Sequence, residues 1–234
     1  MTARLDPRYA VPALLVVLVA VAVVTVQLVE RAGAGMSYCA RHSVQAAQRA
    51  EVVSGSGAPV TVVGDSWSVG LGLEELDGSW PSRLPGRVTV AGFSGSGFSR
   101  TASPCGDVSF GTRALEAPLQ GLVVVEGGLN DFDQPAAAIE RGFRDLMADL
   151  AGHRVVVVGP ADAPSRTRAV PRVDARLEEL SEAYGVPYVR TSDLDLDYLD
   201  DRLHLTEDGH RDFGVAVADR IADVEPTRPA VVRR

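Results

Sequence analysis

Residues 58–68 read APVTVVGDSWS, a strand-like run that is followed at once by small and polar residues. Positions 60–63 are all β-branched, and a short continuous apolar run of this kind is typical of a strand buried on both faces. Comparable runs follow at 88–91, 122–125, 155–158 and 186–189. The sequence therefore predicts five short strands of a buried parallel sheet.

Amphipathic stretches separate these apolar runs. The clearest of them lie at 136–150, 170–184 and 206–224. Strands that alternate with helices are typical of a parallel sheet with helices on both faces. We therefore expect an α/β fold, namely a doubly wound three-layer α/β/α sandwich around a five-stranded parallel sheet.

Length and charge limit the classes of function. The chain has 234 residues, which suits one domain of ordinary size plus an appendage. Its formal net charge is −8, and its arginines are scattered along the sequence rather than gathered in one stripe. Because an acidic surface repels polyanions, we expect no nucleic-acid partner.

The N-terminal region contains a long apolar segment. Residues 10–29 are almost unbroken Val, Leu and Ala, and about 20 helical residues span a bilayer core. Residues 1–31 are therefore a membrane anchor or a signal segment. The length favours an uncleaved anchor, although Ala32-Gly33-Ala34 offers a cleavage site. We expect the rest of the chain to lie outside the cytoplasm, either membrane-anchored or secreted after cleavage.

Composition divides the remaining chain into three parts. Residues 32–58 are rich in Ala, Gly, Ser and Arg and are predicted to be a linker with a short helix around 43–52. Residues 59–224 form the predicted folded domain, and 225–234 a flexible tail. The only two cysteines, Cys39 and Cys105, favour one disulfide in an exported domain. The alternative is two unpaired buried thiols.

Chemically competent side chains stand at the ends of the predicted strands. Ser66 follows the strand at 60–63 and Asn130 follows the strand at 122–125, so both are expected at the same sheet edge. His204 precedes the last helix, whose predicted N-cap is Thr206. A serine hydroxyl becomes a nucleophile when a base takes its proton, and His204 is the candidate base. Asp201, three residues earlier, is the candidate group that orients the imidazole.

Acyl transfer also creates an oxyanion, which fixed N–H donors stabilise. We predict three such donors: the backbone N–H of Ser66, the backbone N–H of Gly95 and the side-chain amide of Asn130. Gly95 follows the strand at 88–91 and therefore reaches the same sheet edge. The acidic run at 193–201 lacks the turn glycine and the bidentate glutamate of a calcium loop, so we interpret it as a solvated loop.

These motifs resemble those of the SGNH (GDSL-type) hydrolase family. Gly64-Asp65-Ser66, Gly95, Gly128-Leu129-Asn130-Asp131 and Asp201-Arg202-Leu203-His204 match the four family blocks in order, and the resemblance covers residues 58–223. It implies a flavodoxin-like fold, chemistry at ester bonds, and no metal or organic cofactor. Two residues depart from the pattern. Trp67 stands where Leu or Ile is usual, and Val90 stands where an Asn often supports the Gly95 loop.

The resemblance therefore implies a serine esterase that forms an acyl-enzyme on Ser66 and acts on a small-molecule or glycan ester. One alternative keeps the same residues but acts on cell-envelope glycans as an O-acyltransferase or a deacetylase. Another alternative is a non-catalytic binding module on the same fold. The sequence leaves the acyl group, the alcohol and the oligomeric state open.

Overall fold

The computed structural model describes residues 15–25, 37–224 and 226–229. The chain divides into two compact units, residues 1–41 and 42–234. In the first unit residues 15–25 are helical, whereas residues 10–14 and 26–29 of the predicted apolar segment lie outside the described residues. No helix within the described ranges is both long and apolar enough to cross a membrane.

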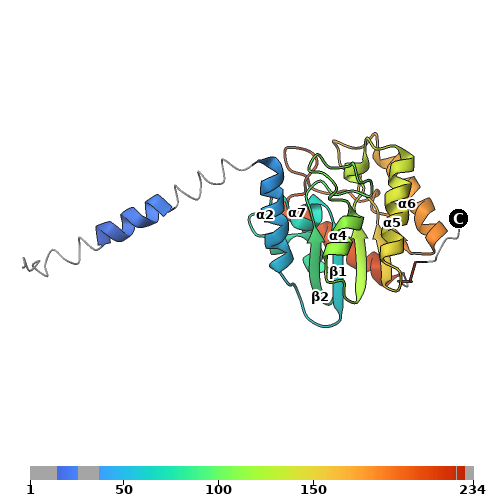
Figure 1. The fold of residues 1–234 in the computed structure, drawn as a ribbon, viewed down its shortest axis with the longest axis horizontal. Coiled ribbons are helices and arrows are strands. Elements are labelled where there is room, and N and C mark those ends of the chain that lie inside the picture. The colour runs from blue at the N-terminus through green and yellow to red at the C-terminus, as the bar shows by residue number, and fades with distance from the viewer. Residues whose placement is uncertain (1–14, 26–36, 225, 230–234) are drawn as a thin grey trace, which may run out of the picture. The chain divides into compact units, whose positions relative to one another are not determined.

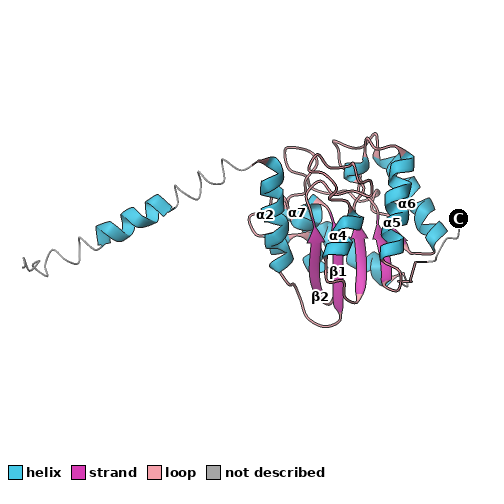
Figure 2. Ribbon diagram, in the orientation of Figure 1, coloured by secondary structure: helices cyan, strands magenta, loops and turns pink. Residues whose placement is uncertain are grey.

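A five-stranded parallel sheet forms the centre of the second unit, as predicted (Figure 2). The spatial order of its strands is β2-β1-β3-β4-β5. The strands are β1 (Pro59–Gly64), β2 (Arg87–Gly92), β3 (Leu122–Glu126), β4 (Arg154–Val158) and β5 (Tyr188–Val189). Strand β1 lies between β2 and β3, so the order in which strands are added to the sheet reverses beside β1. Open α/β sheets bind their ligands at such a point, beyond the carboxyl ends of the strands.

The register aligns the carboxyl ends of the three strands that precede the predicted site. Gly64, the last residue of β1, pairs with Gly92 of β2 on one side and with Glu126 of β3 on the other. The loops that carry Ser66, Gly95 and Asn130 therefore leave the sheet at one edge.

Helices cover both faces of the sheet. They are α2 (Tyr38–Glu51), α3 (Ser66–Val69), α4 (Phe110–Glu116), α5 (Ala136–Asp149), α6 (Val170–Tyr184) and α7 (Glu207–Ala222), with short 3₁₀ turns η1 (Leu76–Gly78), η2 (Trp80–Arg83) and η3 (Leu129–Asp131). Figure 1 shows α4 and α5 in front of the sheet and α7 behind it.

Alternate strand residues feed two hydrophobic cores, one on each face. Val62, Val124 and Val156 belong to the core that includes Phe213 and Val217 of α7. The neighbouring residues Val63, Val125 and Val157 belong to the core that includes Phe110 of α4 and Phe143 of α5. Continuous apolar strands are required because both faces are buried.

The last strand is shorter than the predicted run 186–189. Only Tyr188 and Val189 are paired in register with β4. Pro187 has no backbone N–H to donate, although its carbonyl oxygen still accepts from Val157 N at 3.0 Å. The backbone N–H of Val186 donates instead to Ser181 O of α6 at 3.0 Å, so this residue ends the helical connection rather than starting the strand.

Helix α2 lies within the segment predicted as a linker and is longer than the predicted helix at 43–52. The side chain of Arg49 is completely buried, and its Nε donates to Ser79 Oγ at 3.0 Å. Its Nη1 donates to Val52 O at 3.1 Å. Burial lowers the pKa of Arg49 to about 10, and the charge of Asp77 opposes this shift. The second half of α2 is therefore packed into the folded unit.

The two cysteines of the chain, Cys39 and Cys105, are both disulfide-bonded. This confirms the expectation drawn from their even count, and the alternative of unpaired thiols is wrong. Of the predicted tail, residues 225 and 230–234 lie outside the described residues. Thr227 forms an isolated bridge with Val155 of β4.

Candidate active site

The structure brings Ser66, His204 and Asp201 together in one hydrogen-bonded chain. Nε2 of His204 lies 3.2 Å from Oγ of Ser66, although 138 residues separate the two. Nδ1 of the same ring lies 2.5 Å from Oδ2 of Asp201. Ser66 is the first residue of α3, directly beyond β1, and His204 lies in the loop before α7. The arrangement can move a proton from the serine hydroxyl to the imidazole.

A tight turn fixes the positions of Asp201 and His204 relative to each other. Oδ1 of Asp201 accepts from the backbone N–H groups of Leu203 and His204, both at 2.9 Å. Arg202 takes a left-handed conformation with φ of 58°, which is uncommon for a residue other than glycine. Leu199 N donates to His204 O at 2.8 Å and closes the turn. Asp201 therefore holds both the backbone of the turn and the imidazole ring.

The same hydrogen bonds keep Asp201 ionised. Partial burial acts to raise the pKa of its carboxyl, but the bonds from the His204 ring and from two backbone N–H groups outweigh it, and the pKa is lowered. An ionised Asp201 favours the imidazole tautomer with its proton on Nδ1 and stabilises the imidazolium.

Asp65 prepares the start of the short helix that carries Ser66. It is the N-cap of α3, and its Oδ1 accepts from Trp67 N at 2.9 Å. Burial raises the pKa of Asp65 to about 7, the bond from Trp67 opposes the shift, and the charge of Asp131 adds to it. The carboxyl is thus partly neutral near physiological pH.

The three predicted oxyanion donors differ in whether they already donate a hydrogen bond within the protein. The backbone N–H groups of Ser66 and Gly95 donate to no acceptor within the described part of the chain. Gly95 has φ of +99°, and a Cβ there would lie 3.1 Å from Ser103 Oγ, so only glycine fits without strain. The Asn130 amide is engaged: Nδ2 donates to Ser96 O at 2.8 Å and to Asp65 Oδ2 at 3.2 Å.

Asp131 supports the Gly95 loop, a role that sequence reasoning did not assign. Its two carboxylate oxygens accept from the backbone N–H groups of Phe98, at 2.9 Å, and Ser99, at 2.8 Å. Burial raises its pKa to about 7, while these two bonds oppose the shift. Asp131 thus supplies support for the loop although Val90 replaces the family's asparagine. The signal was present, because Asp131 is the last residue of the Gly-Leu-Asn-Asp motif.

A second buried carboxyl, Glu126, was also missed. Ser68 Oγ donates to Glu126 Oε2 at 2.7 Å, and the indole of Trp80 donates to Ser68 Oγ at 3.1 Å. Burial, followed by the charge of Asp65, raises the pKa of Glu126 well above its ordinary range. The hydrogen bonds from Trp80 to Ser68 and from Ser68 to Glu126 hold α3 in place and thereby help to fix the position of Ser66.

Trp67, the residue after Ser66, is buried in the core. It is 1% exposed, and its ring makes an edge contact with Phe213 at a centroid distance of 5.1 Å. Its Nε1 donates to Leu203 O at 3.0 Å. Trp67 is therefore a packing residue that also links α3 to the turn before His204.

No group of three or more His, Cys, Asp or Glu side chains within the described ranges is arranged to hold a metal ion. In the acidic run at 193–201, Asp193 pairs with both terminal nitrogens of Arg220, at 2.7 and 2.9 Å. Asp201 in the same run contacts His204.

A second histidine, His210, lies in the core. Its burial, followed by the charge of His204, lowers its pKa to about 4.

Comparisons with known proteins bear on the family and the fold. The model of the GDSL-like lipase/acylhydrolase family matches residues 62–211. No curated protein sequence matches the chain. Among solved structures, the carbohydrate acetylesterase Est24 of Sinorhizobium meliloti is similar at a TM-score of 0.58 and 16% identity, over 71% of this chain and 99% of that one.

An inhibitor-bound aryl esterase of M. smegmatis is similar at a TM-score of 0.56 and 16% identity, over 72% of this chain and 100% of that one. Identities this low show a shared fold, whereas the family match extends over more than half of the chain and includes Ser66, Asn130, Asp201 and His204. The chain therefore belongs to the GDSL-like lipase/acylhydrolase (SGNH) family, whose members are serine hydrolases that act on ester bonds.

Proposed function

We propose that this protein is a serine esterase that hydrolyses carboxylic esters through an acyl-enzyme on Ser66. The observation that carries the proposal is the hydrogen-bonded chain from Ser66 Oγ through His204 to Asp201. A serine, an imidazole and a carboxylate joined in this order form the arrangement of a catalytic triad.

The mechanism follows from the positions of these atoms. Nε2 of His204 takes the proton of the Ser66 hydroxyl as Oγ forms a bond to the ester carbonyl carbon. The resulting imidazolium, held by Asp201, then gives its proton to the departing alcohol oxygen as the C–O bond breaks. Nε2 of His204 then takes a proton from a water molecule as the water oxygen attacks the acyl carbonyl carbon. The imidazolium returns this proton to Ser66 Oγ as the bond between Oγ and the acyl carbon breaks, which releases the acid and regenerates Ser66 and His204.

The oxyanion of each tetrahedral intermediate would be bound by the N–H groups of Ser66 and Gly95 and by the amide of Asn130. The first two are free of internal acceptors in the described chain. To donate to the oxyanion, the Asn130 amide must weaken one of its present hydrogen bonds. The longer of these is the bond to Asp65 Oδ2 at 3.2 Å. Burial that raises the pKa of Asp65 to about 7 weakens this competing acceptor near neutral pH.

For location, we propose that the domain is exported or membrane-anchored. Two observations support this: the apolar run at 10–29 and the disulfide-bonded state of Cys39 and Cys105. Disulfides persist in oxidising compartments outside the cytoplasm. Protease treatment of intact cells tests the proposal, since degradation of the domain supports it and full protection contradicts it.

A specific observation favours an acetylated sugar as one substrate class, because one structural relative is described as a carbohydrate acetylesterase. The same residues would then release acetate from a glycan hydroxyl. Assays with acetylated sugars, and with a free sugar as competing acceptor, separate deacetylation from O-acyl transfer.

The deciding experiment uses short para-nitrophenyl esters and an active-site fluorophosphonate probe. We expect the wild type to hydrolyse the esters and to be labelled on Ser66, whereas Ser66→Ala abolishes both. Ser56→Ala is the matched control, because Ser56 is exposed and lies in the segment before β1. A wild type that neither hydrolyses esters nor reacts with the probe would favour the non-catalytic binding module.

A further inference from the structure

A pocket rich in arginine adjoins the candidate active site. It has a volume of about 470 Å³ and is lined by Phe132, residues 164–169 and Arg202. Arg202 stands between Asp201 and His204 in the catalytic turn, and Phe132 follows Asn130 by two positions. We call this site the arginine pocket, after Arg166, Arg168 and Arg202.

The three guanidinium groups have no carboxylate partners among the residues that the structure describes. Of all the ion pairs in the described part of the chain, none involves Arg166, Arg168 or Arg202. Nε of Arg166 is buried and has no hydrogen-bond partner there. The whole chain carries a net charge of −8, whereas the residues that line this pocket include three arginines and no Asp or Glu. Such a concentration attracts anions.

The pocket is also held in shape by contacts. The Arg166 guanidinium carbon lies 3.8 Å from the ring centroid of Phe132. Ser165 N donates to Arg202 O at 2.9 Å, which ties the loop at 164–169 to the catalytic turn. Arg172 donates to Phe132 O at 3.0 Å and so fixes the opposite wall. The cations are thus presented on backbone that is already positioned relative to His204.

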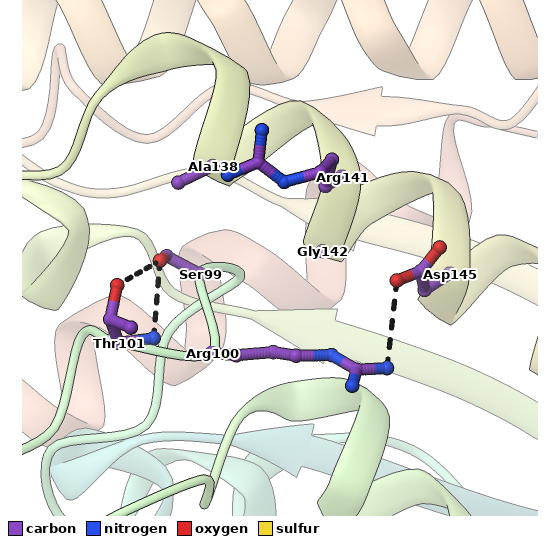
Figure 3. Close-up of a pocket in the computed structure, with 7 residues that line it drawn as sticks. All are labelled: Ser99, Arg100, Thr101, Ala138, Arg141, Gly142 and Asp145. Atoms are coloured by element: carbon purple, nitrogen blue, oxygen red, sulfur yellow. Dashed lines mark hydrogen bonds and ion pairs between the residues drawn. The ribbon is translucent and has the colours of Figure 1, made fainter.

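A second pocket shows how a paired arginine differs. This pocket, about 290 Å³ in volume, lies between the loop after Phe98 and helix α5 (Figure 3). There Arg100 lies 3.5 Å from Asp145, and Arg141 turns away from that pair (Figure 3). The carboxylate compensates the charge of Arg100, so this pocket holds no comparable cluster of free cations.

We propose that the arginine pocket binds a negatively charged group, a carboxylate or a phosphate, that the ester substrate carries near its reacting carbonyl. This inference rests on the proposed esterase function and names its substrate class, an anionic ester. Guanidinium groups bind such anions through charge-assisted, often bidentate hydrogen bonds, and the exposed face of Phe132 packs against the carbon chain between anion and ester.

The test compares two pairs of esters. Para-nitrophenyl hemiglutarate and para-nitrophenyl valerate differ by a carboxylate on the acyl side. Para-acetoxybenzoate and its methyl ester differ by a carboxylate on the alcohol side. We expect kcat/KM to favour the anionic member of one pair by about tenfold, since a hydrogen bond to a charged group contributes that much. The pair that responds identifies the side on which the anion is carried.

Variants connect this preference to the pocket. Arg166→Gln and Arg168→Gln should each reduce the anionic-to-neutral ratio of kcat/KM by about threefold to tenfold, and added salt should reduce it in the wild type. Arg141→Gln is the matched control, because Arg141 is exposed and lines the other pocket. It should leave the ratio unchanged. A wild type without any preference, or an equal loss in all three variants, overturns the proposal.

Failure of the esterase proposal is detected separately. Fluorophosphonate labelling of Ser66 and turnover of the neutral esters report on catalysis alone. Binding of para-acetoxybenzoate and of its methyl ester to the Ser66→Ala variant, measured by calorimetry, reports on the pocket alone. Tighter binding of the anion that is lost in Arg168→Gln supports the pocket even without turnover, and equal binding of the two compounds refutes it.

Discussion

The indole Nε1 of Trp67 donates a hydrogen bond to the carbonyl oxygen of Leu203 at 3.0 Å. Trp67 directly follows Ser66 and Leu203 directly precedes His204, so this single bond joins the two segments whose side chains exchange a proton in the proposed mechanism. The bond spans 136 residues of sequence and is part-buried. We therefore expect Trp67 to act as a positioning residue for Ser66 and His204.

Trp67→Phe should therefore lower kcat while leaving KM nearly unchanged. The phenyl ring keeps the edge contact with Phe213, but the donor to Leu203 is lost, at a cost of about 1 kcal/mol, or roughly fivefold in kcat. Thr191→Val is the control, because it removes another buried donor, the bond from Thr191 Oγ1 to Gly159 O at 2.7 Å, without touching α3 or the turn of His204. Equal losses of kcat in both variants would show that only general stability is at stake.

Asp201→Asn should lower kcat/KM by about a thousandfold or more, because an amide cannot stabilise the imidazolium and permits the wrong tautomer. Asn can still accept the backbone bonds from Leu203 and His204 through its oxygen, so the turn is expected to persist. Asp200→Asn, one residue earlier and also exposed, should keep full activity. The measurement is the pH profile of kcat/KM with a para-nitrophenyl ester.

The lowered pKa of Asp201 also predicts how the free energy of unfolding changes at acidic pH. Because its pKa is lowered in the folded state, the unfolded chain binds this proton more tightly. The stabilisation is present above the unfolded pKa of about 4 and is lost as the pH falls below it. Urea denaturation at acidic pH should therefore show a smaller loss of stability in Asp201→Asn than in the wild type, and identical losses would contradict the assignment.

The sheet was predictable because burial on both faces leaves a signal in a single short run. The apolar run at 60–63 lies within β1, as predicted. Thr206 is the N-cap of α7, also as predicted, and its Oγ1 accepts from Gly209 N at 3.0 Å. The extent of β5 was not predictable from apolar character alone, because Pro187 removes a donor from the ladder.

The supporting shell of the site was harder to predict. Asp131 and Glu126 act through partners that are distant in sequence, namely Ser99 for the first and Ser68 for the second. Nothing local distinguishes a carboxylate that binds such backbone or hydroxyl groups from one that is solvated. The same reason applies to Trp67, whose role depends on the carbonyl of Leu203.

Gly95→Ala should lower kcat more than it lowers stability. At φ of +99° a Cβ costs about 1–2 kcal/mol of strain, and its contact with Ser103 at 3.1 Å would shift the N–H proposed to bind the oxyanion. Gly106→Ala is a matched control, because its φ is +88° and nothing lies within 4 Å of the added carbon. The melting temperature should fall by a similar amount in both variants, whereas kcat should fall only in Gly95→Ala.

The buried carboxyls predict that stability falls as the pH rises from about 4 towards 7. The pKa of Asp131 is raised to about 7 by burial, so the folded state keeps a proton that the unfolded chain releases near pH 4. In this window the folded state binds more protons, and the free energy of unfolding decreases with pH. Each tenfold change in the acid constant corresponds to about 1.4 kcal/mol.

Asp131→Asn should flatten this slope, because an amide does not titrate, although it should also weaken the support of Phe98 and Ser99 at every pH. Asp219→Asn is the control, since Asp219 is exposed on α7 and its charge is not among those that shift the pKa of Asp131. Chemical denaturation at pH values between about 4 and 7 measures the slope directly. Because Asp65 has a pKa of about 7 for the same reason, part of the slope must remain in Asp131→Asn. An unchanged slope in that variant would show that Asp131 is ionised throughout the window.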